Sequence, residues 1–81
     1  MIREEIENKT REIVADLLDI DEETIHDKSD FVNDLQADSL DAVEMVMSVE
    51  DKFDISITDV EAEQAVSFKL LVDLVERKIN A

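Results

Sequence analysis

The side chain best placed for chemistry is the hydroxyl of Ser39, which follows Asp38 and opens an apolar-periodic stretch that predicts a helix. The first backbone N–H groups of a helix are unpaired and the helix dipole is positive there, so a phosphate ester on this hydroxyl would be stabilised. A plainer interpretation is that Ser39 or Asp38 only caps the helix, since both residue types accept hydrogen bonds from its first turn. From the residues alone, both interpretations remain open.

No other residues complete a catalytic group. A serine nucleophile needs a base within hydrogen-bond reach, and the only histidine, His26, falls in a predicted loop without an evident orienting partner. A small bundle also has little room for a pocket that encloses both substrate and catalytic machinery. We therefore predict no catalytic residues and no independent enzymatic activity.

Acidic side chains in the same loop offer a weak metal pattern. Asp19, Asp21 and Glu23 alternate as at the start of a calcium-binding loop, but the chain lacks the glycine that such a loop requires. The absence of cysteine excludes a thiolate site and a disulfide framework, and it fits a reducing compartment. We expect weak cation binding by a solvated acidic surface and no dedicated metal site.

The charge balance narrows the possible partners. Among 81 residues, 23 are acidic and 8 are Lys or Arg, which gives a net charge of −15. Nucleic acids and anionic membranes are therefore disfavoured, and basic protein partners are favoured. We find no signal peptide at the start and no apolar run long enough for membrane insertion. We expect one domain over residues 1–81, acting as a cytoplasmic monomer.

The hydrophobic pattern predicts an all-α fold, a four-helix bundle with three main helices and one short third helix. Apolar residues recur at helical spacing over residues 3–18, 40–53 and 68–79, and no sustained strand pattern occurs. Thr58 and Glu61 form a capping box that predicts the short helix at about residues 59–65, and Ser67 is a cap for the last helix.

A long loop joins the first two predicted helices. It covers about residues 19–38, and so long a connection needs anchors. Asp21 is expected to cap one helical turn over residues 22–25. Apolar residues recur among the acids and are expected to hold the loop on the bundle: Ile20, Ile25, Phe31 and Leu35.

The second predicted helix carries a polar stripe beside apolar side chains. Asp41, Glu44, Ser48 and Asp51 follow at spacings of three and four residues, with Glu50 at the edge of the stripe. Such stripes are usually solvated faces. Here Leu40, Val43 and Met47 lie beside it, and apolar residues among charges of one sign favour a docking surface for a basic partner.

These motifs together resemble an acyl carrier protein of the fatty-acid-synthesis type, over the whole chain. The resemblance rests on Asp38-Ser39-Leu40, the continuation through Asp41-Ala42-Val43-Glu44-Met45-Val46-Met47, and the later Phe53-Asp54-Ile55 and Glu61-Ala62-Glu63. It implies that a phosphopantetheinyl transferase attaches 4′-phosphopantetheine from coenzyme A to Ser39, and that the arm's thiol carries acyl groups as thioesters. It also implies that fatty acid synthesis enzymes with basic patches contact the second helix through Asp38, Leu40, Asp41, Val43, Glu44, Met47, Glu50 and Asp51.

An acyl chain held by such a carrier gains about 0.8 kcal/mol for each methylene that it hides from water. The bundle core is expected to open for it. The candidate lining residues of this acyl pocket are Phe31, Val46, Phe53, Ile57, Ala62, Phe68, Leu71 and Val75.

Two residues depart from the family pattern. Gln36 stands where glycine is usual, and Thr58 where proline often precedes the third helix. If position 36 requires a positive φ, glutamine would cost about 1 kcal/mol there. Neither departure touches Ser39.

Two further functions remain open. A carrier of the same fold could serve polyketide, peptide or D-alanine transfer. A protein of a different class, an unmodified acidic helical adaptor, would only bind basic partners. The acidic second helix and the sequence Ala37-Asp38-Ser39-Leu40 favour the fatty acid carrier.

Overall fold

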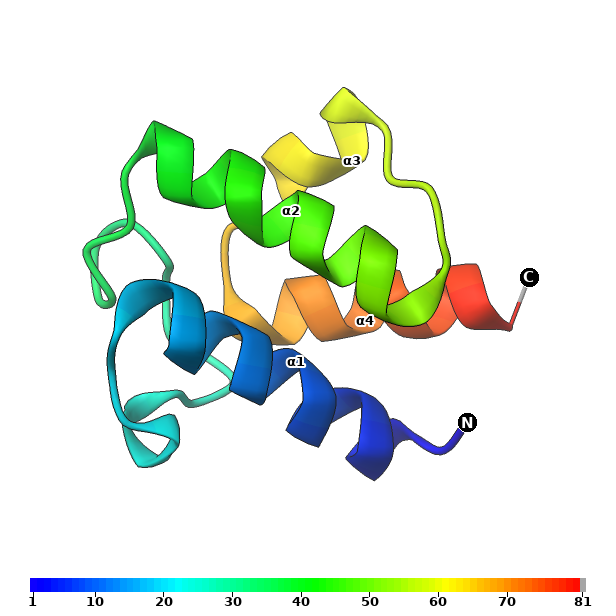
Figure 1. The fold of residues 1–81 in the computed structure, drawn as a ribbon, viewed down its shortest axis with the longest axis horizontal. Coiled ribbons are helices and arrows are strands. Elements are labelled where there is room, and N and C mark those ends of the chain that lie inside the picture. The colour runs from blue at the N-terminus through cyan, green and yellow to red at the C-terminus, as the bar shows by residue number, and fades with distance from the viewer. Residues whose placement is uncertain (81) are drawn as a thin grey trace.

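Four α-helices form the structure, a computed structural model that describes residues 1–80. Helix α1 contacts both α2 and α4, and α2 contacts α4. In Figure 1, α1 runs antiparallel to α2 and α4, α3 lies above α2, and the N-terminus and the C-terminal end of α4 lie at the same end of the molecule. The predicted all-α fold is confirmed, with α1 over Arg3–Leu18, the 3₁₀ turn η1 over Glu22–Thr24, α2 over Ser39–Phe53, α3 over Asp59–Gln64 and α4 over Phe68–Ile79.

The core is supplied by three of the helices and by the long loop. Helix α3 contributes no buried residue, whereas α4 alone contributes five. This difference leaves α3 less firmly held than the other helices, because burial of apolar surface is the main source of packing energy. The buried core residues in contact with one another are Ile6, Val14, Ala15, Ile25, Phe31, Ala37, Met45, Val49, Phe68, Leu71, Val72 and Val75.

The predicted N-caps are in place. The N–H of Asp41 donates to the Asp38 carboxylate at 2.8 Å, and the N–H of Asp38 donates to the Asp41 carboxylate at 3.1 Å. Thr58 and Glu61 form the same reciprocal box at the start of α3. The Ser67 hydroxyl accepts a hydrogen bond from the first turn of α4.

The loop between α1 and α2 is anchored as predicted. Ile25 and Phe31 are buried, and Ile20 and Leu35 pack against the core. The predicted side-chain cap by Asp21 is wrong, because both the N–H and the hydroxyl of Thr24 donate to the main-chain carbonyl of Asp21 instead.

Three residues other than glycine have positive φ. Asp19 and Asp54 adopt the left-handed conformation that ends α1 and α2, with φ of 55° and 54°. Gln36 has φ of 59° in the turn before α2. Position 36 therefore does require a positive φ, and the glutamine there, where glycine is usual, costs about 1 kcal/mol of backbone strain.

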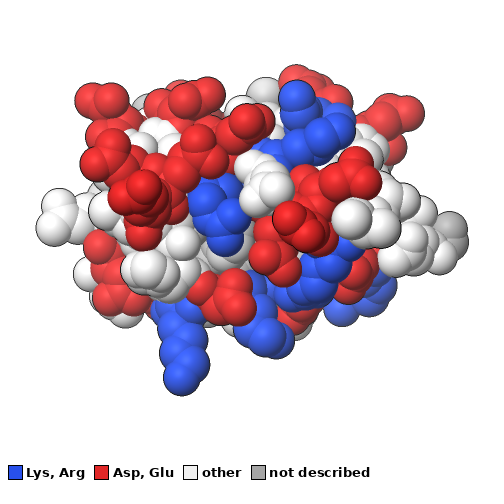
Figure 2. All heavy atoms as spheres, turned by 90° about the horizontal axis from the view of Figure 1, so that it is seen from below, with Lys and Arg blue, Asp and Glu red and all other residues white. Residues whose placement is uncertain are grey.

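Ion pairs join α1 to α4. The Arg3 guanidinium contacts Asp73 at 2.7 Å, Glu76 at 3.0 Å and Glu7 at 3.2 Å. The hydrogen bond from Arg3 lowers the pKa of Asp73 below its ordinary value. Figure 2 shows the face seen from below, where α1 lies, and basic side chains are interspersed there among the acidic ones.

Candidate functional site

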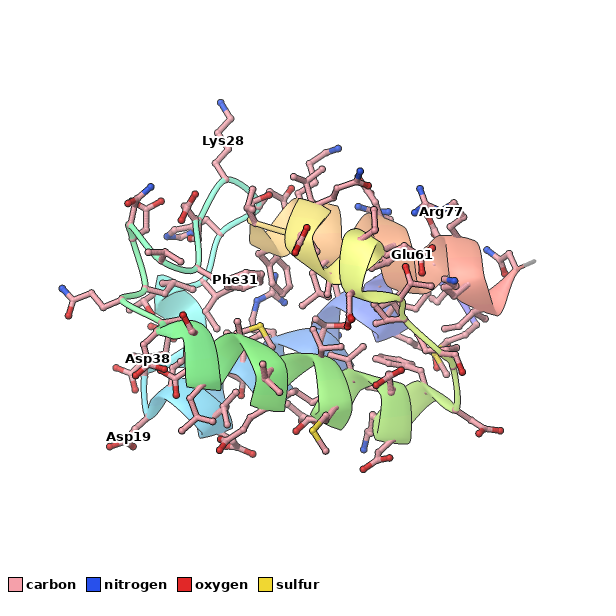
Figure 3. The ribbon with its side chains drawn as sticks, turned by 90° about the horizontal axis from the view of Figure 1, so that it is seen from above. Asp19, Lys28, Phe31, Asp38, Glu61 and Arg77 are labelled. Atoms are coloured by element: carbon pink, nitrogen blue, oxygen red, sulfur yellow. The ribbon has the colours of Figure 1, made fainter. Side chains whose placement is uncertain are left out.

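The Ser39 side chain lies exposed on the first residue of α2. Asp38 performs the capping, and among residues 1–80 no side-chain hydrogen bond uses the Ser39 hydroxyl. Figure 3 shows Asp38 at the start of α2, at the opposite end of the molecule from the C-terminal end of α4. The structure thus answers a question that the sequence left open, because capping does not occupy the serine hydroxyl.

The surroundings of this hydroxyl suit a phosphate ester. Within the described part of the chain, the N–H groups of Ser39 and Leu40 have no hydrogen-bond acceptor, whereas those of Asp41 and Ala42 donate to Asp38. Two free donors therefore remain at the positive end of a fifteen-residue helix. A phosphate bound covalently to Ser39 would lie near these two N–H groups and near the positive end of the helix dipole.

The residues predicted to dock partners lie mainly exposed along α2. Leu40, Val43 and Met47 have exposed fractions of 66%, 56% and 58%, and their spacing of three and four residues places them on one face of α2. Lys52 is the only base on α2, and α3 carries none. The acidic candidates surround this apolar strip: Asp38, Glu44 and Asp51 are exposed, and Asp41 and Glu50 are partly buried.

A further exposed apolar side chain, which the sequence did not single out, lies on α3. Val60, in the first turn of α3, is 63% exposed. The short helix has too few residues for a periodic pattern to show which of its faces is free, so only its apolar type in an acidic segment could have marked Val60.

A groove of about 440 Å³ lies between α2 and α3. Of the eight residues predicted to line an acyl pocket, Val46, Ile57 and Ala62 lie on this groove. Phe53 is partly buried against the core, and the other four are buried in the core: Phe31, Phe68, Leu71 and Val75. The groove lining that the sequence missed consists of Ala42, Val43, Met47, Glu50, Asp59 and Glu63.

The remaining candidates for chemistry are isolated. His26 is exposed, and its backbone N–H donates to the Ser29 hydroxyl at 2.9 Å. Among residues 1–80, the structure contains no group of three or more His, Cys, Asp or Glu side chains that could hold a metal ion. A search of the same residues finds no helix with the length and apolar character needed to cross a membrane.

An exposed serine hydroxyl without a side-chain hydrogen bond lies at the start of an acidic helix within a four-helix fold, which agrees with the carrier domain that the sequence resembles. The family model described as "Phosphopantetheine attachment site" matches residues 8–75. The chain is 41% identical over 73 residues to the acyl carrier protein of Buchnera aphidicola subsp. Acyrthosiphon pisum (strain Tuc7), which covers 90% of this chain and 91% of that relative. It is 40% identical over 80 residues to the acyl carrier protein of Picosynechococcus sp., which covers 99% of both chains.

The chain therefore belongs to the acyl carrier protein family. Proteins of this family are generally non-catalytic carriers with a covalently attached 4′-phosphopantetheine. The uncapped hydroxyl and the free donors at the start of α2 fit that group.

Proposed function

We propose that this protein carries acyl intermediates of fatty acid biosynthesis as thioesters on a 4′-phosphopantetheine arm attached to Ser39. The proposal rests on one observation at the start of α2: Asp38 caps the helix, so the Ser39 hydroxyl is free to be modified. When attached, the group supplies the thiol that this cysteine-free chain lacks.

The attachment chemistry needs little from the chain itself. The Ser39 oxygen attacks the pantetheine-bearing phosphorus of coenzyme A, and a base of the phosphopantetheinyl transferase takes the hydroxyl proton. The pyrophosphate bond of coenzyme A breaks in the same step, and 3′,5′-ADP leaves. The free N–H groups of Ser39 and Leu40 then face the new phosphate diester at the positive end of α2. We assign no catalytic residue to this chain, in keeping with its role as a carrier.

Intact-mass measurement after incubation with coenzyme A and a transferase tests the attachment. The wild type is expected to gain one phosphopantetheine group and Ser39→Ala none. Ser56→Ala is the matched control, since Ser56 is also exposed but lies in the loop before α3, and this variant should gain one group. An unchanged wild-type mass with a competent transferase would favour the unmodified adaptor.

The exposed strip of α2 is the proposed docking surface for the transferase and the synthesis enzymes. Its acids would orient a basic patch, and Leu40, Val43 and Met47 would lose water on contact. Methionine adapts its shape easily, which suits a carrier that must meet several enzymes. We propose that residues 1–81 act as one monomeric domain, and the cysteine-free sequence supports a cytoplasmic location.

The groove between α2 and α3 is the proposed shelter for the acyl chain. It begins beside Ala42, one helical turn beyond Ser39, and its apolar walls include Val46, Ile57 and Ala62. Burial of methylenes there would stabilise the loaded carrier. The core candidates Phe31, Phe53, Phe68, Leu71 and Val75 would line the shelter only if the bundle opened further.

The choice of pathway is tested separately. The loaded protein should be a substrate for ketosynthases of fatty acid synthesis and a poor partner for adenylating ligases that serve peptide or D-alanine carriers. The relatives named "Acyl carrier protein" support this choice. Preference for an adenylating ligase in a side-by-side panel would move the protein to another pathway while leaving its carrier role intact.

A further inference from the structure

Within residues 1–80, Glu50 is the acid of the proposed docking surface whose carboxylate is hydrogen-bonded to a residue beyond α2 and its N-cap. Its Oε2 accepts a hydrogen bond from the N–H of Ile57 at 2.8 Å, across the turn that leads from α2 to α3. By contrast, Glu44 and Asp51 are exposed, and none of the side-chain hydrogen bonds within residues 1–80 uses them. Glu50 is therefore turned into the molecule, away from a docking partner.

The place of Glu50 is at one end of the groove. Ala42, Val46 and Glu50 follow at intervals of four residues, so they lie on one face of α2, and all three line the groove. Ala42 is nearest to Ser39 along the helix, and Glu50 is farthest from it. The eight residue steps from Ala42 to Glu50 span about 12 Å of helix axis.

This end of the groove is unfavourable for hydrocarbon. An apolar chain that reached Glu50 would strip water from a carboxylate, which is costly unless the charge is paired. Pushing the carboxylate aside would leave the N–H of Ile57 without its acceptor. Phe53 and Ile55, which follow Glu50 along the chain, pack against the core and do not line the groove.

We propose that Glu50 closes the inner end of the groove and thereby sets the longest acyl chain that the carrier shelters, an inference that rests on the proposed function. An extended chain advances about 1.2 Å per bond, so 12 Å of groove corresponds to about ten carbons. Glu50 would thus determine the specificity of the carrier for acyl chain length, and its contribution to partner docking would be secondary.

Acylated proteins of increasing chain length test the inference. A transferase that accepts acyl-coenzyme A loads the wild type, Glu50→Ala and Glu50→Gln, with chains from well below to well above the expected limit. Intact mass verifies each loading, and the melting temperature is then measured. Glu12→Ala is the matched control, because Glu12 is an exposed glutamate of α1 that does not line the groove.

In the wild type, the melting temperature should rise with chain length up to about ten carbons and then level off. Glu50→Ala should shift the levelling to longer chains, because it removes the closing side chain. Glu50→Gln keeps a similar size and an oxygen acceptor for the Ile57 N–H but removes the charge, so its levelling should fall between those of the wild type and Glu50→Ala. Glu12→Ala should level off where the wild type does.

A wild-type melting temperature that keeps rising past the limit, or an alanine variant that levels off at the wild-type length, would overturn the role of Glu50. Should Glu50→Ala not fold, the wild-type series decides alone. Failure of the wild type to gain mass would instead reject the proposed function, before any melting temperature is measured.

Discussion

The side of the molecule built from α1 and α4 and the side built from α2 and α3 are held together by different means. Between α1 and α4, Arg3 bridges to Asp73 and Glu76, and the Arg11 guanidinium lies 4.9 Å from the centre of the Phe68 ring. Helix α3 has no buried residue, and Lys52 is the only base between Asp38 and Val66.

Few specific contacts hold α3 in place. The Lys78 ammonium contacts the Glu61 carboxylate at 2.8 Å, and the Glu50 carboxylate accepts a hydrogen bond from the N–H of Ile57, two residues before α3. Figure 3 shows Glu61 on α3 and Arg77 on the neighbouring last turns of α4. Segments with few buried contacts open at low free-energy cost, so the groove beside α3 can open while α1 and α4 stay packed.

The comparison shows that α1 and α4 form the firmly packed half of the molecule, whereas the residues proposed for attachment, docking and acyl binding lie on α2 and α3. The exposed apolar strip, the free serine and the groove all belong to α2 and α3. Within residues 1–80, most of the fully buried side chains belong to α4 and α1, among them Phe68 and Ile6, and Val49 is the one that α2 contributes. Four predictions test this division, beginning with the largest expected effect.

Truncation in the packed half should cost most. Phe68→Ala removes a ring with no exposed surface and its contact with Arg11, which should reduce the free energy of unfolding by about 3–5 kcal/mol. Val60→Ala, at an exposed position of α3, should change it by less than about 0.5 kcal/mol. Urea denaturation followed by circular dichroism measures both. Equal losses would mean that the two halves are equally integral to the core.

Charge reversal should affect binding on the α2 side only. Glu44→Lys should weaken association with a basic synthase enzyme about tenfold and flatten its salt dependence, because Glu44 lies exposed within the proposed docking strip. Glu12→Lys makes the same charge change on α1 and should leave affinity nearly unchanged. Titration of each variant at two ionic strengths gives the comparison. If Glu44→Lys and Glu12→Lys bound the enzyme with equal affinity, the acidic strip of α2 would be a solvated face and not a docking surface.

Release of backbone strain before α2 should raise stability modestly. Gln36→Gly should increase the free energy of unfolding by up to about 1 kcal/mol, because glycine adopts the positive φ of this position without a steric penalty. Asp54→Gly, at the other end of α2, should gain less, since aspartate tolerates the left-handed conformation better than glutamine. A loss of stability in Gln36→Gly would show that the glutamine side chain makes compensating contacts. Urea midpoints of the two variants decide this.

The sequence predicts the helices well because apolar spacing and capping residues are local signals. The capping box at Thr58 needed no tertiary information, whereas the predicted side-chain cap at Asp21 is wrong because the main-chain carbonyl of Asp21 accepts the hydrogen bonds instead. The state of the Ser39 hydroxyl was beyond reach, because neighbouring aspartate and serine cap equally well until the backbone geometry is known.

The groove was harder to predict than the helices. Phe31 and Phe68 are buried in the core, whereas Val46 and Ile57 line the groove between α2 and α3. All four are apolar, so residue type alone does not distinguish core residues from groove residues. The positive φ of Gln36 could be anticipated only through the family resemblance, in which glycine is usual at this position, since this chain contains no glycine to mark it.

The ion pair that fastens α3 should show the smallest effect and the clearest pH dependence. The hydrogen bond from Lys78, together with the N–H of Thr58, lowers the pKa of Glu61 to about 2. Because this pKa lies below the ordinary value of 4.5, the stabilisation from Glu61 is fully present above pH 4.5 and is lost as pH falls toward 2. Lys78→Met should raise the pKa of Glu61 in an NMR titration and increase amide exchange in α3. Arg77→Met is the control, since Arg77 is an exposed base of the same turn; an unchanged Glu61 pKa in Lys78→Met would mean that the pair does not hold α3 in solution.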